Sequence, residues 1–518
     1  MKNDYRIATA DFETDPFEAN LIPKPFSWGF FDGDDYKDNW SDDPEECVAA
    51  LMRHLDSLTE PHRVYMHNGG KFDFFYLLKY LQGEIRVVNG RILEASYGIH
   101  QFRDSYAAIP VPLSEYRKDD IDYEKLRRGV RNQHRKEILS YQRTDCIALH
   151  ELVTAYIAEF GHVLTIGSAS MRQFGKFHKV KRCGKNFDEK FRKFYYGGRN
   201  QCFQTGIINR PLKIFDINSQ YPHAMRTFKH PVGISHEVHL TIPKNCAFAV
   251  IEADNYGALP VRQKLGLDFT QKRGTYWATI HEINAGEETG SLRIRKVVKA
   301  YSFSETMTFD DFVDHFYSQR MKARENGDKL RTIFYKLVLN SSYGKFAQNP
   351  ENYADWRITR NDEIITEEGW SVAFECMDYF LWKKPVTVPQ YYNVATAASI
   401  TGAARSLMLR GIRASTFPVY CDTDSLICEN LDAEIDPKKL GAWKFEGEGD
   451  CVAIAGKKLY AMFKNGEPIK YASKGAKITP NDIRRVAEGD VVQWQSDRPS
   501  FNVAHDPIFI SRRISRTT

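Results

Sequence analysis

Two aspartates, Asp422 and Asp424, stand two residues apart in the apolar run 420–428, with only Thr423 between them. Residues two apart in a β-strand point to the same side of the sheet, so a strand here would bring the two carboxylates together. Like charges repel, and burial strengthens the repulsion. The pattern therefore predicts either a cation that offsets the charge or a simple Asx turn. A calcium loop of the EF-hand type is excluded, because Ile427 occupies its obligatory glycine position.

A third aspartate and one helical face could complete a site for phosphoryl transfer. Asp216 ends an apolar strand, and Lys336, Asn340 and Tyr343 follow the spacing i, i+4 and i+7, which is one face of a helix. Phosphoryl transfer needs metals that bridge the phosphates, a positive clamp and a positioned nucleophile. We expect Asp216 and Asp424 to hold two Mg²⁺ or Mn²⁺ ions, because these hard cations prefer carboxylate oxygen.

The neighbouring residues suit the other parts of a nucleotide site. The backbone carbonyl of Ile217 would be a further metal ligand, and Lys336 would contact the triphosphate. Asn340 and Tyr343 would line the nascent base pair. Tyr221 would lie beneath the sugar and exclude a 2′-hydroxyl, the group that separates RNA precursors from DNA precursors. Each residue alone has a simpler explanation, since such a lysine is usually a solvated charge and a tyrosine usually belongs to the core.

The N-terminal segment contains a second set of carboxylates. Asp11 and Glu13 are again two apart on a predicted strand, and Asp145 lies one helical turn after Tyr141. Together with Asp73, these acids could hold two divalent cations about 4 Å apart, an arrangement that generates hydroxide and cleaves a phosphodiester. Tyr141 would orient the attacking water. In isolation, acids near strand ends are commonly caps or surface residues.

Length and composition limit the class of protein. A chain of 518 residues predicts more than one domain. The net charge of +5 gives no overall field that would announce a nucleic-acid partner, so any basic surface must be local. Nine cysteines without a CxxC pair argue against a zinc ribbon and against a secreted disulfide framework. No stretch is as long and apolar as a membrane span or a signal peptide requires, so we expect a cytoplasmic protein that does not enter membranes.

The order of predicted elements indicates a multidomain protein of the α/β plus α+β class. A buried strand is predicted over 5–12, an amphipathic helix over 145–160, short strands over 229–311 and helices over 318–347. Segment 172–199 interleaves ten Lys or Arg residues with Phe and Tyr, against two acids. That mixture suits single-stranded nucleic acid, although a solvated linker has the same composition.

Taken in order, these motifs resemble those of the protein-primed family B DNA polymerases over essentially the full chain. The family's three exonuclease motifs have counterparts in Asp11-Phe12-Glu13, in Asn68 with Phe72-Asp73, and in Tyr141 with Asp145. The polymerase motifs have counterparts in DxxSxYP from Asp216, KxxxNSxYG from Lys336, YxDTDS from Tyr420 and KxY from Lys458. The run YYGGR at 195–199 matches the family's YxGG segment, which lies between the two domains.

The resemblance implies roles for individual residues. The catalytic residues would be Asp216, Asp422, Asp424, Tyr141 and Lys118, with Asp422 supporting the metal site rather than ligating throughout. The metal ligands would be Asp216, Ile217, Asp424, Asp11, Glu13, Asp73 and Asp145. Nucleotide contacts would come from Ser219, Tyr221, Lys336, Asn340, Tyr343 and a further fingers cation, for which Lys322 ranks before Lys329 and Arg324. DNA contacts would come from Thr14, Asn68, Phe72, Tyr195, Gly197, Gly198, Thr423, Lys458 and Tyr460.

The resemblance also implies an architecture and partners. We expect an RNase H-like 3′–5′ exonuclease domain and a right-hand polymerase with two palm insertions. The expected divisions are exonuclease 1–165, basic linker with YxGG 166–198, palm 199–228 and 391–474, insertion 1 229–311, fingers 312–348, insertion 2 349–390 and thumb 475–518. Insertion 1 would contact a terminal protein primer, and insertion 2 would serve processivity and strand displacement. The implied partners are primer-template DNA, deoxynucleoside triphosphates and the terminal protein, bound by a monomer in a host cytoplasm.

Three functions compete on this sequence. The first is a proofreading, template-directed DNA polymerase. The second is a 3′–5′ exonuclease whose C-terminal region only binds DNA. The third is a replication scaffold without catalysis, which is disfavoured because a binding module has no use for two clusters of mutually repelling acids.

Overall fold

The N-terminal region is built on a mixed sheet around strand β1 (Arg6–Thr14). The computed structural model describes residues 5–117, 120–264, 266–386 and 392–517. β1 pairs in parallel with β4 (His62–Met66), and β4 pairs in parallel with β7 (His100–Asp104). Antiparallel strands continue the sheet on both sides: β2 (Pro25–Phe31), β3 (Tyr36–Trp40), β5 (Gly83–Val88) and β6 (Arg91–Tyr97). Its helices are α1 (Pro44–Asp56), α2 (Phe74–Leu77), α3 (Ser105–Ala108) and α4 (Arg135–Phe160).

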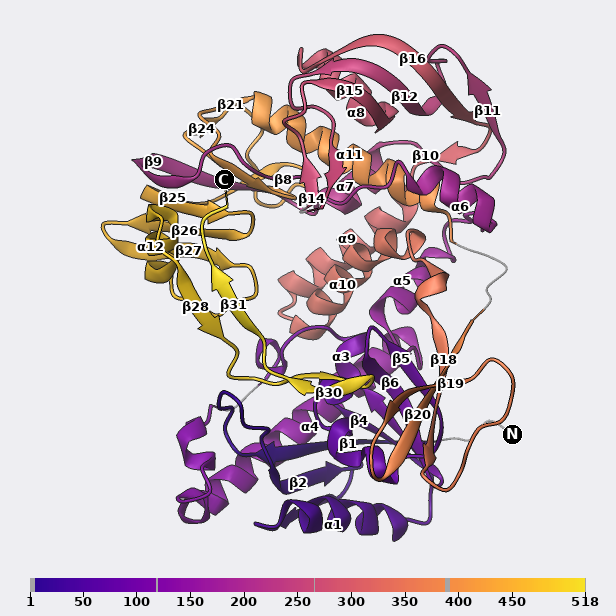
Figure 1. The fold of residues 1–518 in the computed structure, drawn as a ribbon, viewed down its shortest axis with the longest axis vertical. Helices are drawn as coiled ribbons and strands as arrows, with labels where there is room; N and C mark the ends of the chain where they lie inside the picture. Colours follow the sequence, from indigo (N-terminus) through magenta and orange to yellow (C-terminus); the bar gives the residue numbers. More distant parts are fainter. Residues whose placement is uncertain (1–4, 118–119, 265, 387–391, 518) are drawn as a thin grey trace.

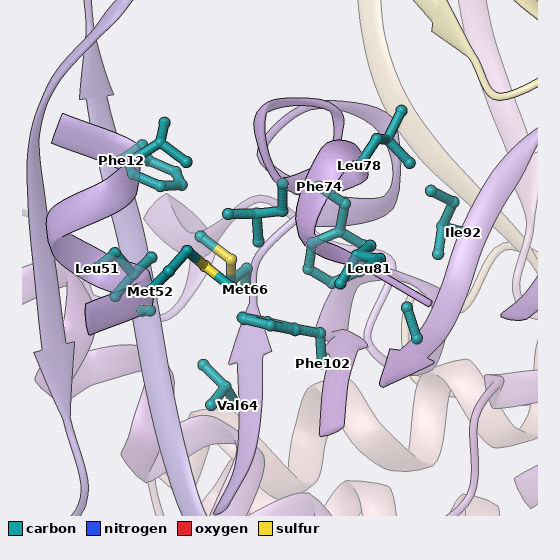
Figure 2. Packing of buried hydrophobic residues seen from close by; sticks show 14 of the residues in the cluster. Phe12, Leu51, Met52, Val64, Met66, Phe74, Leu78, Leu81, Ile92 and Phe102 are labelled. Atoms are coloured by element: carbon teal, nitrogen blue, oxygen red, sulfur yellow. The ribbon is translucent and has the colours of Figure 1, made fainter. Parts of the chain in front are cut away.

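A buried apolar core holds β1 in place. Phe12, Met66 and Phe102 project from strands towards Leu51 of α1 and Phe74 of α2, and all five are at most 4% exposed (Figure 2). Removing this apolar surface from water is the main favourable contribution to folding of the region. The predicted strand over 5–12 and the predicted helix over 145–160 are both present, the helix beginning earlier, at Arg135.

Insertion 2 adds a hairpin to the same sheet. It contains β18 (Ala354–Arg360), β19 (Ser371–Glu375) and β20 (Tyr379–Pro385), which lie beside the exonuclease strands in Figure 1. β18 pairs antiparallel with β5, placing Ile358 opposite Gly83, and the result is one ten-stranded sheet. Ile358 is completely buried in the core around β1. The sequence gives no sign that this hairpin joins a sheet formed by strands some 270 residues earlier in the chain.

The palm is a seven-stranded sheet in the order β27-β26-β25-β9-β23-β22-β8. Its two longest strands, β9 (Gly206–Ile217) and β25 (Trp443–Gly456), pair with each other. The other strands are β8 (Asn200–Cys202), β22 (Tyr420–Asp422), β23 (Ser425–Cys428), β26 (Leu459–Lys464) and β27 (Glu467–Ser473), with a small ladder of β21 (Ser415–Thr416) and β24 (Asn430–Leu431). The palm helices are α7 (Gln220–Thr227) and the almost wholly buried α11 (Val394–Arg413).

Insertion 1 forms a separate sheet at the opposite end of the molecule from the exonuclease region (Figure 1). Its four strands follow the order β11-β16-β12-β15, with α8 (Ile280–Glu288) packed against them. The strands are β11 (His236–His239), β12 (Cys246–Asn255), β15 (Arg273–Thr279) and β16 (Leu292–Phe303), flanked by the pairs β13 (Val261–Gln263) with β14 (Gly266–Asp268) and β10 (His230–Pro231) with β17 (Thr306–Met307).

The fingers are two helices, α9 (Asp310–Glu325) and α10 (Lys329–Phe346). The sequence predicts helices over 318–347, and the structure has two, separated at Gly327, whose φ is 71°. Asp328 then caps α10, because its side chain accepts the N–H of Arg331. The basic segment before the palm contains α5 (Ile166–Phe174) and α6 (Lys185–Arg192).

The thumb crosses from the palm to the N-terminal region. α12 (Pro480–Glu488) packs on palm strands, whereas β28 (Val492–Gln495), β29 (Ser500–Asn502), β30 (His505–Ile508) and β31 (Ser511–Ile514) extend down to the N-terminal sheet (Figure 1). No helix among the described residues combines the length and the apolar character needed to cross a lipid bilayer.

Candidate active sites

The aspartates at 422 and 424 flank a tight turn. β22 ends at Asp422 and β23 begins at Ser425, so Asp422 and Asp424 do not share one strand as the spacing alone suggests. Thr423, between them, adopts a φ of 62°, and its N–H donates to the carbonyl of Arg199 at 2.6 Å. The sequence offered two alternatives, a turn or a cation that offsets the charge. The turn is present here, and so is a cation, Lys458, beside Asp422.

Asp216 lies beside this turn. The register of β9 against β23 places Asp216 opposite Ser425, and the N–H of Ile217 donates to the carbonyl of Asp424 at 2.8 Å. Burial and, next to it, the negative charge of Asp424 raise the pKa of Asp216 to about 7. Burial likewise raises the pKa of Asp424. Two carboxylates that are more than two hundred residues apart in the sequence therefore share one electrostatic environment.

Lys458 offsets the charge of Asp422. Its Nζ lies 2.8 Å from both carboxylate oxygens, and Asn200 donates to the same group at 3.1 Å. Lys458 lies in the turn between β25 and β26 and has a φ of 58°. Tyr460 is on β26, with its ring 4.8 Å from that of Tyr420.

A cavity of about 860 Å³ opens between the palm and the fingers. Most of the residues that the sequence assigns to nucleotide addition line it: Asp216, Ser219, Tyr221, Lys336, Asn340, Tyr343, Asp422, Thr423, Asp424, Lys458 and Tyr460. Ile217, by contrast, points its side chain into the core and is 2% exposed. The rings of Tyr221 and Tyr343 stack at 4.0 Å with an angle of 11° between their planes, which joins the palm helix α7 to the fingers helix α10.

The fingers cations in this cavity differ from the first choice made on the sequence. Arg320 and Arg324 line the cavity, whereas neither Lys322 nor Lys329 is among its lining residues in the described part of the chain. On α9, residues four apart share a face and residues two apart do not, which separates Arg320 and Arg324 from Lys322. Nη1 of Arg320 also approaches Oγ of Ser219 at 3.4 Å.

Glu446 is an acidic residue of the cavity that sequence reasoning missed. It lies on β25, forms ion pairs with Lys444 at 2.7 Å and with Lys470, and contributes to the raised pKa of Asp216. Lys444 is the direct neighbour of Asp216 across β9 and β25. In the sequence, Glu446 belongs to an alternating charged run that is typical of an exposed strand, so no local signal distinguishes it.

The YxGG segment lies against the catalytic turn. A Cβ added to Gly198 would lie 2.8 Å from Thr423 side-chain atoms and 3.0 Å from the hydroxyl of Tyr221, so only glycine fits here without a shift. Arg405 of α11 donates to the carbonyl of Gly197 at 2.8 Å. Tyr195 is half-buried, and its carbonyl accepts from Arg262 at 2.7 Å.

The N-terminal acids surround Cys146 on α4. Burial raises the pKa of that thiol, and negative charges raise it further; they come from Asp11, Asp145, Glu13 and Asp73. β1 carries the first pair of acids, α4 carries Asp145, and Asp73 precedes α2. Burial raises the pKa of Asp73 to about 7, and its Oδ1 has no hydrogen-bond donor among the described residues. Tyr141 is 7% exposed, and burial raises the pKa of its hydroxyl, with Asp145 adding to the effect.

A smaller pocket of about 430 Å³ opens beside these acids. It is lined by Asp11, His67, Asn68, Arg91, Tyr106, Pro112, Leu113, Asp145, Leu149 and Arg498. The pose of Asn68, left open by the sequence, is left-handed with a φ of 64°, and its Oδ1 accepts from Arg91 at 2.9 Å. Gly70 is required next to it, because a Cβ there would lie 1.8 Å from the carbonyl of Ile92.

The other residues assigned to the exonuclease lie around this pocket or outside the description. Phe72 packs its ring 5.5 Å from that of Phe17 and 5.6 Å from that of Phe501 in the thumb. Thr14 is a buried residue at the end of β1. Lys118 lies outside the described residues.

The acids do not form a compact metal cage. Among the described residues, no three side chains of His, Cys, Asp or Glu are arranged closely enough to hold a metal ion by themselves. Repulsion between carboxylates opposes such a cluster in a chain described without its ligands. Mg²⁺ commonly uses one or two carboxylates and completes its shell with water and phosphate oxygens, so two facing aspartates are a suitable donor set for it.

The fold and the paired-aspartate cavity define a nucleotidyl-transferring enzyme, and comparison with known proteins identifies its family. The family model of DNA polymerase type B, organellar and viral, matches residues 1–433. The DNA-directed DNA polymerase of Enterobacteria phage PRD1 is 47% identical, over 100% of this chain and 99% of its own length. The chain therefore belongs to the type B DNA polymerases of organelles and viruses, and it is a DNA-directed DNA polymerase.

Solved structures show the same fold. Phi29 DNA polymerase with primer-template DNA is 19% identical and matches with a TM-score of 0.73, over 99% of this chain and 100% of that chain. Its ternary complex with primer-template DNA and incoming nucleotide substrates is 18% identical and matches with a TM-score of 0.74 over the same shares. The expected multidomain architecture is thus confirmed at the level of the fold.

Proposed function

We propose that this DNA polymerase adds deoxynucleotides to a primer in the cavity between palm and fingers, with Asp216 and Asp424 as the two metal-holding carboxylates. The observation that carries the proposal is the register of β9 against β23, together with the hydrogen bond from Ile217 to the Asp424 carbonyl. This backbone pairing fixes both carboxylates relative to one another before any substrate binds. The solved complexes of phi29 polymerase with primer-template DNA and nucleotides support primer-template DNA and nucleotides as the substrates here.

The donor set fits divalent magnesium or manganese. It consists of carboxylate oxygens and one backbone carbonyl, that of Ile217, and a bound cation would offset the burial and the repulsion from Asp424 that raise the pKa of Asp216. When bound, two such cations would polarise the transferring phosphoryl group and activate the attacking oxygen. Asp422 would act through its ion pair with Lys458, which keeps the turn and the β25–β26 connection together.

The remaining cavity residues suit an incoming deoxynucleoside triphosphate. Lys336 on α10 and Arg324 on α9 present two cations from the fingers for the phosphates, with Arg320 held near Ser219. Tyr221 would lie beneath the sugar, backed by the ring of Tyr343. A 2′-hydroxyl would then meet an aromatic ring that cannot withdraw, because its far face is already in contact.

We also propose that the N-terminal domain is a proofreading 3′–5′ exonuclease. Asp11, Glu13, Asp73 and Asp145 would be its metal ligands, and Tyr141 would orient the attacking water. The support is their common position around Cys146 and the buried Oδ1 of Asp73, which has no donor among the described residues. Asn68 and Phe72 would grip the single-stranded end, and Thr14 would contact its backbone.

A reciprocal pair of variants tests both assignments. Asp424→Asn should abolish extension of a matched primer while leaving magnesium-dependent degradation of single-stranded DNA. Asp145→Asn should do the opposite. Normal primer extension by Asp424→Asn would overturn the polymerase assignment. If Asp424→Asn lost degradation as well as extension, one site shared by both activities would be favoured.

The priming mode is a further part of the proposal. Insertion 1, a separate four-stranded sheet, would contact a terminal protein whose hydroxyl starts the chain, and insertion 2 would help to enclose DNA during strand displacement. We propose that the enzyme acts as a monomer in a host cytoplasm. Extension of a primer on a circular single-stranded template tests displacement: product longer than one circle is expected, and arrest at one circle length would contradict it.

A further inference from the structure

The tip of the thumb is seated on the exonuclease domain. Phe501 contacts the rings of Phe72 and Phe75 at 5.6 and 4.9 Å, and Nζ of Lys71 donates to its carbonyl at 3.0 Å. The N–H of Val503 donates to the carbonyl of Gly90 at 3.2 Å. Phe501 is on β29 and Val503 is in the turn between β29 and β30, so this short segment is attached to the N-terminal domain at two neighbouring points.

Arg498, in the connection between β28 and β29, lines the pocket that contains Asp11, Asn68 and Asp145. Its guanidinium lies 4.6 Å from the ring centre of Phe17, and within the described residues it forms no ion pair with a carboxylate. The other arginine of the pocket, Arg91, is engaged with the buried Asp104 and with Asn68. Arg498 is thus the pocket's cation whose donors remain available to a ligand.

The surroundings of Arg498 suit both parts of a single strand, its bases and its phosphates. Phe17 and Phe72 are half-buried, and their rings lie 5.5 Å apart, so the exposed parts of these two rings offer bases an aromatic surface, while the buried Phe501 packs behind Phe72. A guanidinium stacked on such a ring is held flat and presents a fixed set of N–H donors, a geometry suited to phosphate. The carboxylates of the pocket repel the negatively charged phosphates of a strand. A cation on another side of the pocket is therefore needed to attract the strand.

We propose that Arg498 of the thumb completes the exonuclease site by binding a backbone phosphate near the 3′ end of a single strand. The inference rests on the proposed exonuclease function and extends it, because it makes the site a composite of two domains. A strand leaving the palm would follow the thumb to its tip and enter the pocket against a residue of the same subdomain. Arg498 is a binding residue in this proposal, and the hydrolysis itself is left to the N-terminal acids.

The test is degradation of a single-stranded oligonucleotide by the full chain, with Arg498→Ala, Arg498→Lys and the control Arg513→Ala, which removes an exposed thumb arginine on β31. Arg498→Ala should raise KM about tenfold with little change in kcat, as expected for one lost charge-assisted contact. Arg498→Lys should recover part of the loss, and Arg513→Ala should match the wild type. The salt dependence of binding should lose about 0.7 from its logarithmic slope, the share of one phosphate on a single strand.

Neutral linkages identify the contact directly. Methylphosphonate replacement of each of the three terminal linkages, one at a time, should raise KM of the wild type at one linkage and leave KM of Arg498→Ala unaffected there. If every linkage affects both proteins equally, Arg498 does not touch the strand. If Arg498→Ala instead binds Mn²⁺ more tightly at unchanged KM, the arginine merely neutralises the acids, and the proposal is overturned.

The outcome separates this inference from the function on which it rests. If the wild type does not degrade single strands and Asp145→Asn changes nothing, the exonuclease assignment itself fails. If the wild type degrades single strands and Asp145→Asn does not, the exonuclease assignment stands. If, in addition, Arg498→Ala has the KM and the salt slope of the wild type, the composite site is refuted.

Discussion

The four carboxylates of the polymerase cavity fall into two pairs, one with lysine partners and one without. Asp422 is neutralised by Lys458, and Glu446 by Lys444 and Lys470. Asp216 and Asp424 have no such ion pair among the described residues, and burial raises the pKa of both. The two residues proposed to hold metal are therefore the two whose charge the protein leaves to be compensated by a ligand.

A pH dependence of stability follows from Asp216. Its pKa is about 7 in the folded chain and near 3.8 in the unfolded chain, so between these values the folded state binds more protons and stability falls as pH rises. In EDTA at pH 8, Asp216→Asn should therefore unfold with a free energy about 1–2 kcal/mol higher than the wild type, a figure discounted for solvent screening. Denaturant titration of both proteins at pH 8 and pH 4 measures it. An equal difference at the two pH values would contradict the assignment.

Tyr221 should govern sugar selection. Tyr221→Val removes the ring that a 2′-hydroxyl would meet, and discrimination between dATP and ATP in kcat/KM should fall by roughly 10- to 200-fold. Tyr221→Phe keeps the ring stacked on Tyr343 and should retain the discrimination. The ratio of the two specificity constants, measured in single-nucleotide extension, decides the matter; unchanged selectivity in Tyr221→Val would remove the proposed gate.

At the scale of elements, the YxGG segment packs closely against the catalytic turn and α7. There is no room for a methyl group at Gly198, whereas there is room for one at the adjacent Gly197. Gly198→Ala would push Thr423 and Tyr221, and a displacement of catalytic groups by less than 1 Å should lower kcat for nucleotide addition roughly tenfold or more. At Gly197 the added methyl would meet no described atom within 4 Å, so Gly197→Ala should keep kcat and change at most the affinity for primer-template. Equal kcat in both variants, from rapid-quench extension, would show that the packing does not matter.

An element could be predicted from the sequence where residues within the element determine it, and could not where contacts with distant residues determine it. The strand that carries Asp216 and the helical face of Lys336, Asn340 and Tyr343 were predictable, because periodicity determines them. The turn at Thr423 was only one of two alternatives, because what holds it is a distant group, the carbonyl of Arg199 next to the edge strand β8. Arg324 was offered only as an alternative, since a choice among nearby cations depends on where α9 lies relative to the cavity.

The whole molecule is tied together by contacts that no local pattern contains. β18 joins β5 across some 270 residues, and Arg498 of the thumb reaches the pocket beside Asp11 and Asp145 from the far end of the chain. Glu446 enters the cavity only because β25 pairs with β9. The sequence therefore supported the two sets of acids and the order of the domains, whereas the joints between domains came from the three-dimensional arrangement.

Insertion 2 should depend on the exonuclease core for its stability, and the core on it. Ile358→Ala removes a fully buried side chain and should cost about 2–4 kcal/mol locally. Hydrogen exchange should accelerate in peptides covering both 354–360 and 83–88, although these are distant in sequence. Ile364→Ala, at a position 68% exposed in the same insertion, is the matched control. Unchanged exchange in 83–88 would show that the two strands open independently.

The central claim is that Asp216 and Asp424 share bound metal. Fe²⁺ substituted for Mg²⁺, with ascorbate and peroxide, generates hydroxyl radicals that cut the backbone only close to the bound ion. We predict cuts around both 216 and 424 in the wild type, and loss of both cuts in Asp216→Asn and equally in Asp424→Asn, while any cuts at the N-terminal acids persist. If either variant loses only the cut next to its own substitution, the two aspartates bind metal separately and the account is wrong.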